Sequence, residues 1–258
     1  MQIRGIIFDL GHTLMHLSDT WPAVFDRGVV DLIAFLSVKR PDLDGPAFAR
    51  AWLERRRDGF ARSSTTLREV TAEETMRWTF AQAGVPDPDP ALVSGAIDAF
   101  FAYEDACWFP DPDSLSVLQE LAGRGLRLGL FSNATHDPFI QHVVDRLGFR
   151  PFLDPVLSSA GVGVRKPDPA AFAPCLEAWS LPAGSVVVVG DSLEHDIEGA
   201  HRAGMRGVWY RSRENARQEG GGYGDEGARD QIRPEAVIER LGQLPERLES
   251  LEIGKESD

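Results

Sequence analysis

The sequence contains little cysteine: Cys107 and Cys175 are the two cysteines among 258 residues, and they lie far apart, without metal-ligand spacing. This excludes a disulfide framework and is typical of proteins in reducing compartments. Long hydrophobic runs are also missing, since no window approaches the roughly 18 uninterrupted apolar residues of a membrane span. The chain enters an apolar strand almost at its start, which leaves no room for a signal peptide. These features predict a cytoplasmic protein.

Positive charge is scarce as well. Lysine and arginine number 27 against 40 acidic residues, which gives a formal net charge of −13. A surface that binds nucleic acid nonspecifically must be basic, because it displaces the counterions of the phosphate backbone. We therefore expect neither nucleic acid nor a membrane as a partner. A small anionic ligand is compatible with this charge, because a local cluster can be positive in an acidic protein.

Five short apolar runs have the length of a β-strand, and a polar or turn-prone stretch follows each of them. They are residues 6–8, 126–131, 155–157, 186–189 and 207–210. Helical spacing of apolar residues occurs between or after them, at Ile140, Val144 and Leu147 and at Val237, Leu241 and Leu244. Because strands that alternate with helices form parallel sheets, the pattern predicts a Rossmann-like α/β core with helices on both faces.

Residues 17–105 carry four helical patterns and no strand pattern. Thr71 and Glu74 within them form a capping box, which is a sequence pattern that starts a helix. We expect an α-helical bundle over 17–105, inserted into a discontinuous core of 1–16 and 106–258. The two chain crossings, near His16 and Ala106, are expected to act as hinges of this bundle.

The stretch 211–230 is rich in glycine and charged residues and has no apolar periodicity. Such a composition cannot bury enough apolar surface to order a segment. We predict a mobile loop within the core.

Polar side chains follow the ends of successive predicted strands. Asp9 follows the first, Ser132 and Asn133 the second, Lys166 lies in the loop after the third, and Asp191, Ser192 and Asp196 follow the fourth. In open α/β sheets, ligands bind outside the carboxyl ends of the strands. Each of these residues alone has an ordinary explanation, such as a helix cap or a surface loop. Their joint occurrence at four strand ends predicts one polar site.

The ordered set Asp9, Ser132, Lys166, Asp191 and Asp196 resembles the four motifs of the haloacid dehalogenase superfamily of hydrolases. The stretches FSN, KPDP and GDSLEHD carry this likeness, which extends from residue 5 to about residue 210. The helical insertion after the first motif resembles the C1-type cap of that superfamily. The resemblance implies a capped hydrolase whose site lies between the core and the cap.

The resemblance also implies a phosphatase mechanism for small phosphorylated metabolites. Asp9 would attack phosphorus and form an aspartyl-phosphate, which water then hydrolyses. Ser132, Asn133 and Lys166 would bind the phosphoryl oxygens. Lys166 would in addition neutralise Asp9, as expected where fixed cations and donors meet developing charge.

Mg²⁺ is the cofactor that the resemblance implies. A carboxylate that approaches a phosphate dianion is repelled, so that a cation is required. Asp9, the backbone carbonyl of Gly11 and Asp191 would ligate Mg²⁺, and Asp196 would support it directly or through water. Oxygen ligands of this kind suit an ion that prefers octahedral geometry with several retained waters.

Gly11 departs from the pattern of most phosphatases in the superfamily, which carry a second aspartate there. That aspartate protonates the leaving oxygen, a contribution of about 10²–10⁴-fold. His12 is the nearest substitute, because its reference pKa of about 6.5 suits proton transfer. The alternative is that no side chain replaces the acid.

Two other functions are compatible with Gly11. A 2-haloacid dehalogenase-like hydrolase would use Asp9 as nucleophile without a metal or an acid at position 11. In that case Asp191 and Asp196 would crowd the site with uncompensated negative charge, which favours the phosphatase. A catalytically weakened binding or scaffold member of the superfamily is the third hypothesis. We expect a monomer or a homodimer.

Overall fold

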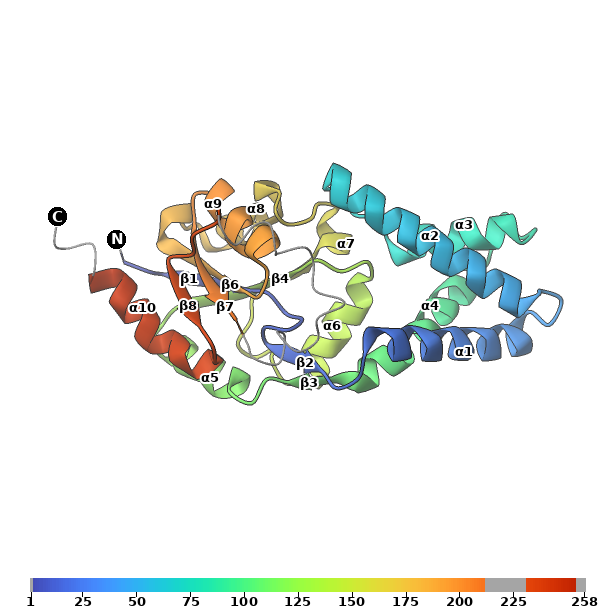
Figure 1. Ribbon diagram of the computed structural model, residues 1–258, viewed down its shortest axis with the longest axis horizontal. Coiled ribbons are helices and arrows are strands. Elements are labelled where there is room, and N and C mark those ends of the chain that lie inside the picture. Colours follow the sequence, from blue (N-terminus) through green and yellow to red (C-terminus); the bar gives the residue numbers. More distant parts are fainter. Residues whose placement is uncertain (1, 212–230, 254–258) are drawn as a thin grey trace.

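The computed structural model describes residues 2–211 and 231–253. The predicted mobile loop over 211–230 therefore lies outside the described residues, apart from Arg211. Two bodies are visible in Figure 1: a sheet covered by helices, and an elongated group of helices beside it. Within the described residues, no helix is both long and apolar enough to span a membrane.

The core is built on one sheet of six strands. In spatial order they are β5 (Val156–Ser158), β4 (Arg127–Ser132), β1 (Gly5–Phe8), β6 (Val186–Gly190), β7 (Arg206–Tyr210) and β8 (Ala236–Ile238). Each neighbouring pair is parallel, with Phe8 aligned to Leu130 on one side and to Val189 on the other. This confirms the predicted parallel sheet and puts the carboxyl ends of β1, β4 and β6 side by side.

Helices cover both faces of the sheet. One face carries α5 (Ser114–Gly123), α6 (Asp137–Arg146) and α10 (Leu244–Ile253), and the other carries α8 (Ala173–Trp179) and α9 (Glu198–Arg202). Shorter helical segments are α7 (Ser159–Val162), η1 (Pro169–Ala171), η2 (Ala183–Ser185), η3 (Leu193–Ile197) and η5 (Leu241–Gln243).

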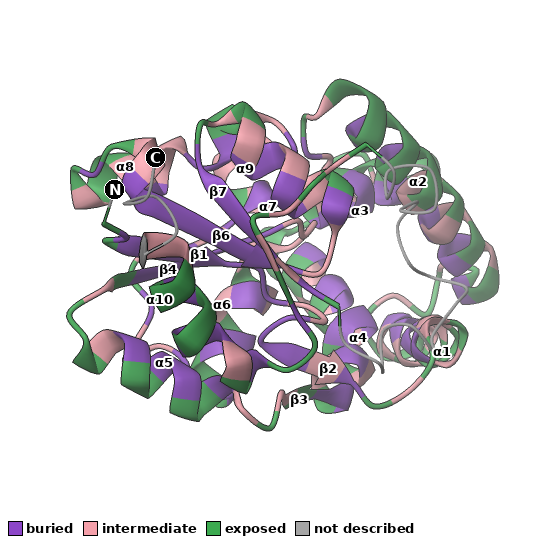
Figure 2. Ribbon diagram, turned by 60° about the vertical axis from the view of Figure 1, so that its left-hand side comes forward, coloured by how far each residue is buried: buried purple, intermediate pink, exposed green. Residues whose placement is uncertain are grey.

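The strands are apolar because both of their faces are buried. Ile6 and Phe8 of β1 pack into the cluster under α5 and α6, whereas Ile7 packs into the cluster under α8 and α9. Side chains alternate between the faces of a strand, so a strand between two helical layers reads as a continuous apolar run. Figure 2 shows the central strands β1 and β6 as buried along their length.

The helix predicted from Val237, Leu241 and Leu244 is wrong in its first part. Val237 belongs to β8, which pairs with β7, and α10 begins only at Leu244. The helical spacing is misleading because Leu241 and Leu244 are fully buried, whereas Val237 is 38% exposed on an edge strand.

The predicted bundle consists of α1 (Trp21–Lys39), α2 (Gly45–Thr66), α3 (Ala72–Gln82) and α4 (Pro90–Cys107). These helices enclose a hydrophobic core of their own, which contains Trp52 and Phe80. The predicted capping box is present, with Thr71 accepting from the Glu74 backbone and the Glu74 side chain accepting from the Thr71 backbone. We refer to α1–α4 and their connections as the cap.

A short antiparallel ribbon joins the core to the cap. It pairs β2 (Met15–Leu17), on the way into the cap, with β3 (Trp108–Pro110), on the way out. The sequence did not indicate this ribbon, because three-residue strands carry no recognisable alternation.

Candidate active site

Lys166 stands at the centre of the polar cluster at the carboxyl edge of the sheet. Its Nζ atom lies 2.6 Å from Oδ1 of Asp9 and 2.6 Å from Oδ1 of Asp196, and it donates to the carbonyl of Phe131 at 2.9 Å. Burial by itself lowers the pKa of Lys166, but Asp196 and Asp9 outweigh burial and raise the pKa above its usual value. The ammonium group therefore stays charged and compensates part of the acidic cluster.

Three carboxylates meet at this edge. Oxygen atoms of Asp9, Asp191 and Asp196 all lie within 4.8 Å of one another. Burial, with the charge of Asp196, raises the pKa of Asp9 to about 6 against the opposing effect of Lys166. Burial and the neighbouring Asp9 and Asp196 likewise raise the pKa of Asp191 well above its usual value. Burial is thus the main cause of both pKa shifts, and the neighbouring carboxylates add to it.

This donor set fits a hard divalent cation. Three carboxylates against the one ammonium group of Lys166 leave an excess of negative charge, and oxygen is the donor that Mg²⁺ prefers. The sequence makes room for the cluster at Gly190, where a Cβ atom would overlap the carboxylate of Asp196. Asp196 is also fixed by the backbone N–H of Ser192, which donates to Oδ2 at 3.0 Å. Asp9, Asp191 and Asp196 could therefore hold such an ion together.

Ser132 and Asn133 lie at the end of β4, beside Asp9. Ser132 is the last residue of the strand and is buried. The amide of Asn133 donates to the carbonyl of Lys166 at 3.0 Å and accepts from its backbone N–H at 2.9 Å. Asn133 thus holds the Lys166 backbone against the end of β4, a role that the sequence did not indicate. The contacts of Ser132 and Asn133 with phosphate stay predictions.

Trp108 stands over Gly11. A Cβ atom at position 11 would meet the Trp108 ring at 3.5 Å, so the indole occupies space next to the missing side chain. His12 has a left-handed φ of 61° and packs its ring edge-on against Trp108, with centroids 5.4 Å apart. The imidazole is therefore part of an aromatic group at the base of the cap. Its catalytic role stays a prediction.

Glu104 and Arg56 line the cap side of this aromatic group. The indole N–H of Trp108 donates to Glu104 at 3.3 Å, and burial raises the pKa of Glu104 to about 6. The Arg56 guanidinium lies over the rings of Phe100 and Phe101, at 4.8 and 5.1 Å from their centroids. Sequence reasoning singled out neither Glu104 nor Trp108, because both lie within the pattern of an ordinary amphipathic helix and its end.

A family model for haloacid dehalogenase-like hydrolases matches residues 3–204. The chain therefore belongs to the haloacid dehalogenase-like hydrolase family, which confirms the resemblance drawn from the motifs. The protein is therefore a hydrolase.

Relatives with named activities include phosphatases and a dehalogenase. The chain is 30% identical to the glyceraldehyde 3-phosphate phosphatase of Methanocaldococcus jannaschii, over 79% of this chain and 82% of that protein. It is 34% identical to the phosphatase of the same name from Methanopyrus kandleri, but this match spans about half of each chain, 46% and 51%. Among solved structures, a 2-haloacid dehalogenase from Pseudomonas syringae is similar with a TM-score of 0.70 and 27% identity, covering 96% and 99% of the two chains.

Proposed function

We propose that the protein is a Mg²⁺-dependent phosphatase of small phosphomonoesters that works through an aspartyl-phosphate on Asp9. The observation that carries this proposal is the cluster of Asp9, Asp191 and Asp196 within 4.8 Å, with Lys166 bound to Asp9. A hydrolase that attacked an uncharged carbon would gain nothing from three converging carboxylates. A phosphatase needs them, because they hold the cation that offsets the repulsion between nucleophile and phosphate.

The residues of the site have different roles in the proposed reaction. One oxygen of Asp9 forms a bond to phosphorus while the bond from phosphorus to the leaving oxygen breaks, and water later cleaves the acyl phosphate. Lys166 orients Asp9 and, with the Ser132 hydroxyl, donates to the phosphoryl oxygens. Asp9, the carbonyl of Gly11, Asp191 and Asp196 would hold Mg²⁺, which neutralises charge on the phosphoryl group when it is bound.

The relatives support a small phosphorylated metabolite as substrate. Two of them are named for the hydrolysis of glyceraldehyde 3-phosphate, a three-carbon phosphomonoester. A substrate of that size suits a site whose nucleophile, Asp9, is only 9% exposed.

A panel of small phosphomonoesters tests the proposal. With Mg²⁺ present, the wild-type protein should release phosphate from at least one of them, and chelation with EDTA should abolish the release. Asp9→Asn keeps the shape of the side chain but removes the attacking charge, so turnover should fall to background. The variant should still show a cooperative thermal unfolding transition, which indicates that it is folded. Full phosphatase activity in Asp9→Asn, or in metal-free protein, would contradict the mechanism.

Carbon–halogen cleavage is the second candidate, favoured by Gly11 and by the likeness to a 2-haloacid dehalogenase. In that reaction Asp9 would displace halide from carbon and form a carboxylic ester, with no proton needed by the leaving group. Halide release from 2-haloacids by metal-free protein, without phosphate release from the panel, would establish it in place of the phosphatase.

A further inference from the structure

The cap also contacts the core away from the two chain crossings. The turn between α2 and α3 lies against the loop that precedes Lys166. The backbone N–H of Glu69 donates to the carbonyl of Gly163 at 3.1 Å, and that of Arg165 donates to the carbonyl of Leu67 at 2.9 Å. The two hydrogen bonds make a short antiparallel bridge between cap and core.

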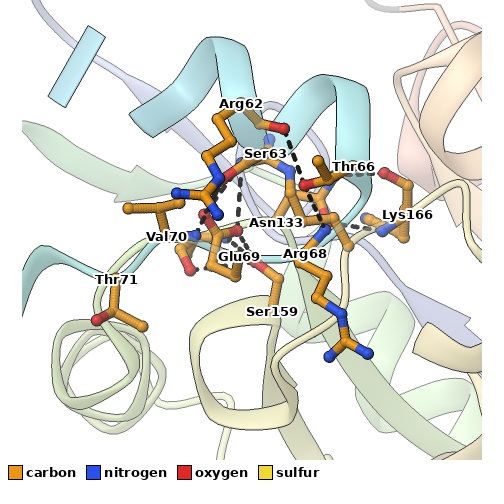
Figure 3. Close-up of polar contacts among 12 residues, drawn as sticks. Arg62, Ser63, Thr66, Arg68, Glu69, Val70, Thr71, Asn133, Ser159 and Lys166 are labelled. Carbon is orange, nitrogen blue, oxygen red and sulfur yellow. Dashed lines mark hydrogen bonds and ion pairs between the residues drawn. The ribbon is translucent and has the colours of Figure 1, made fainter. Parts of the chain in front are cut away.

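The side chain of Glu69 is buried in the core below this bridge. Both of its oxygens contact Nη1 of Arg165, at 3.1 and 3.2 Å, and the hydroxyl of Ser159 donates to it at 2.5 Å. Glu69 and Arg165 have side-chain exposures of 0% and 3%. Figure 3 shows Glu69 pointing from the cap toward Ser159. An ion pair so fully desolvated holds its partners in one geometry, because separating them leaves each charge buried without a counterion.

The partners of Glu69 adjoin both loops that carry the predicted phosphate ligands. Arg165 immediately precedes Lys166. Ser159 accepts from the backbone N–H of Ala134 at 2.9 Å, next to Asn133, and Asn133 in turn holds the Lys166 backbone. The contacts therefore lead from the Glu69 carboxylate through Ser159 to the loop after β4, and from there through Lys166 and Arg165 back to Glu69.

We propose that Glu69 is a positioning residue, through which docking of the cap sets the positions of Lys166 and of the loop after β4. This role rests on the proposed function, since it concerns the side that binds phosphate. The metal side is different, because Asp9 and Asp191 follow β1 and β6. Among the described residues, the hydrogen bonds and ion pairs of Glu69 go to Ser63, Ser159, Gly163 and Arg165, and none goes to these two strands. Loss of the Glu69 charge should therefore loosen phosphate binding and leave the carboxylate cluster in place.

Glu69→Gln is the first test, because it keeps the shape and removes the charge. The inhibition constant of inorganic phosphate should rise on the order of 10- to 100-fold, as is typical when residues that orient a site are changed. The affinity for Mg²⁺, measured by calorimetry, should change by a smaller factor than the inhibition constant of phosphate. A variant that is merely destabilised would lose both affinities, or neither. Glu73→Gln, at an exposed carboxylate on α3, is the matched control and should resemble wild type.

Hydrogen–deuterium exchange of the wild-type protein, Glu69→Gln and Ser159→Ala provides a measurement that does not require enzyme turnover. In Glu69→Gln, exchange should accelerate in residues 132–135 and 159–167 and stay unchanged in β1 and β6. Ser159→Ala, a milder change, should accelerate residues 132–135 more than 163–167, because it leaves the Arg165 ion pair intact. Unchanged exchange in both loops, or unchanged phosphate inhibition in a Glu69→Gln protein whose loops exchange faster, would overturn the role.

The two proposals fail in different ways. A wild-type protein that hydrolyses no phosphomonoester would refute the proposed function, while the exchange pattern would still decide whether Glu69 orders the two loops.

Discussion

Glu104 should make the stability of the protein fall as the pH rises through the weakly acidic range. Burial on α4 raises its pKa from 4.5 to about 6, against the smaller opposing effects of Arg56 and the Trp108 indole. The unfolded chain therefore releases this proton at a lower pH than the folded protein does. The contribution of the group to stability is complete below about pH 4.5 and is lost as the pH rises through about 6. Since one pKa unit corresponds to about 1.4 kcal/mol, the loss amounts to about 2 kcal/mol.

Glu104→Gln isolates this contribution, because glutamine can still accept from Trp108 but cannot ionise. Free energies of unfolding in urea are measured for both proteins between about pH 4 and pH 7.5, with chelator present throughout. Other titrating groups, Asp9 included, cancel in the difference. Relative to wild type, the variant should gain about 2 kcal/mol across this range.

The control is Glu54→Gln, the same substitution at an exposed carboxylate on α2, which should not reproduce the gain of about 2 kcal/mol expected of Glu104→Gln. The reasoning about burial is refuted if Glu104→Gln and wild type give parallel profiles. A difference that grows toward acid would also refute it, because that is the sign of a carboxylate stabilised by its neighbours.

Three further results are expected. Asp191→Asn should weaken Mg²⁺ binding, measured by calorimetry, by about tenfold or more, and wild-type affinity in this variant would remove Asp191 from the metal site. Gly190→Ala should lower the free energy of unfolding in urea by about 1–3 kcal/mol, since its methyl group would overlap the Asp196 carboxylate, and an unchanged value would contradict that packing. If no side chain replaces the acid missing at Gly11, kcat/KM should be about 10²–10⁴-fold higher for nitrophenyl phosphate than for alkyl phosphates, and His12→Ala should preserve this ratio. A loss on alkyl phosphates alone in His12→Ala would instead assign the proton to His12.

The sheet and the convergence of polar residues could be predicted because they depend on local patterns. A strand buried on both faces must be apolar throughout, and β1 and β6 are. Parallel strands share a carboxyl edge, so Asp9 and Asp191, which directly follow two such strands, were expected at one place. The contact between Lys166 and Asp9 joins residues 157 positions apart, and the order of the motifs nevertheless indicated it.

The contacts between cap and core could not be predicted, because they depend on how two bodies with separate hydrophobic cores meet. Glu69 and Arg165 are 96 positions apart, and each looks like an ordinary surface charge in the sequence. The position of Arg165 beside Lys166 was the one available signal. Trp108 over Gly11 is a similar case, since the sequence reveals a missing side chain but not what occupies the space beside it. The strand β8 was not predicted, because it has three residues, lies at the edge of the sheet and exposes an apolar residue, so that it shows no recognisable strand pattern.

The ribbon of β2 and β3 gives the cap a particular relation to the rest of the chain. Leu17 pairs with Trp108, so the chain departs and returns at neighbouring positions of one ribbon. The four helices of the cap therefore occupy the position of the turn in a β-hairpin formed by β2 and β3. The entropic cost of bringing the two strands together grows only with the logarithm of the length of the connection, so a long connection raises this cost little more than a short one does. The length of the inserted bundle therefore places little constraint on the pairing of β2 with β3.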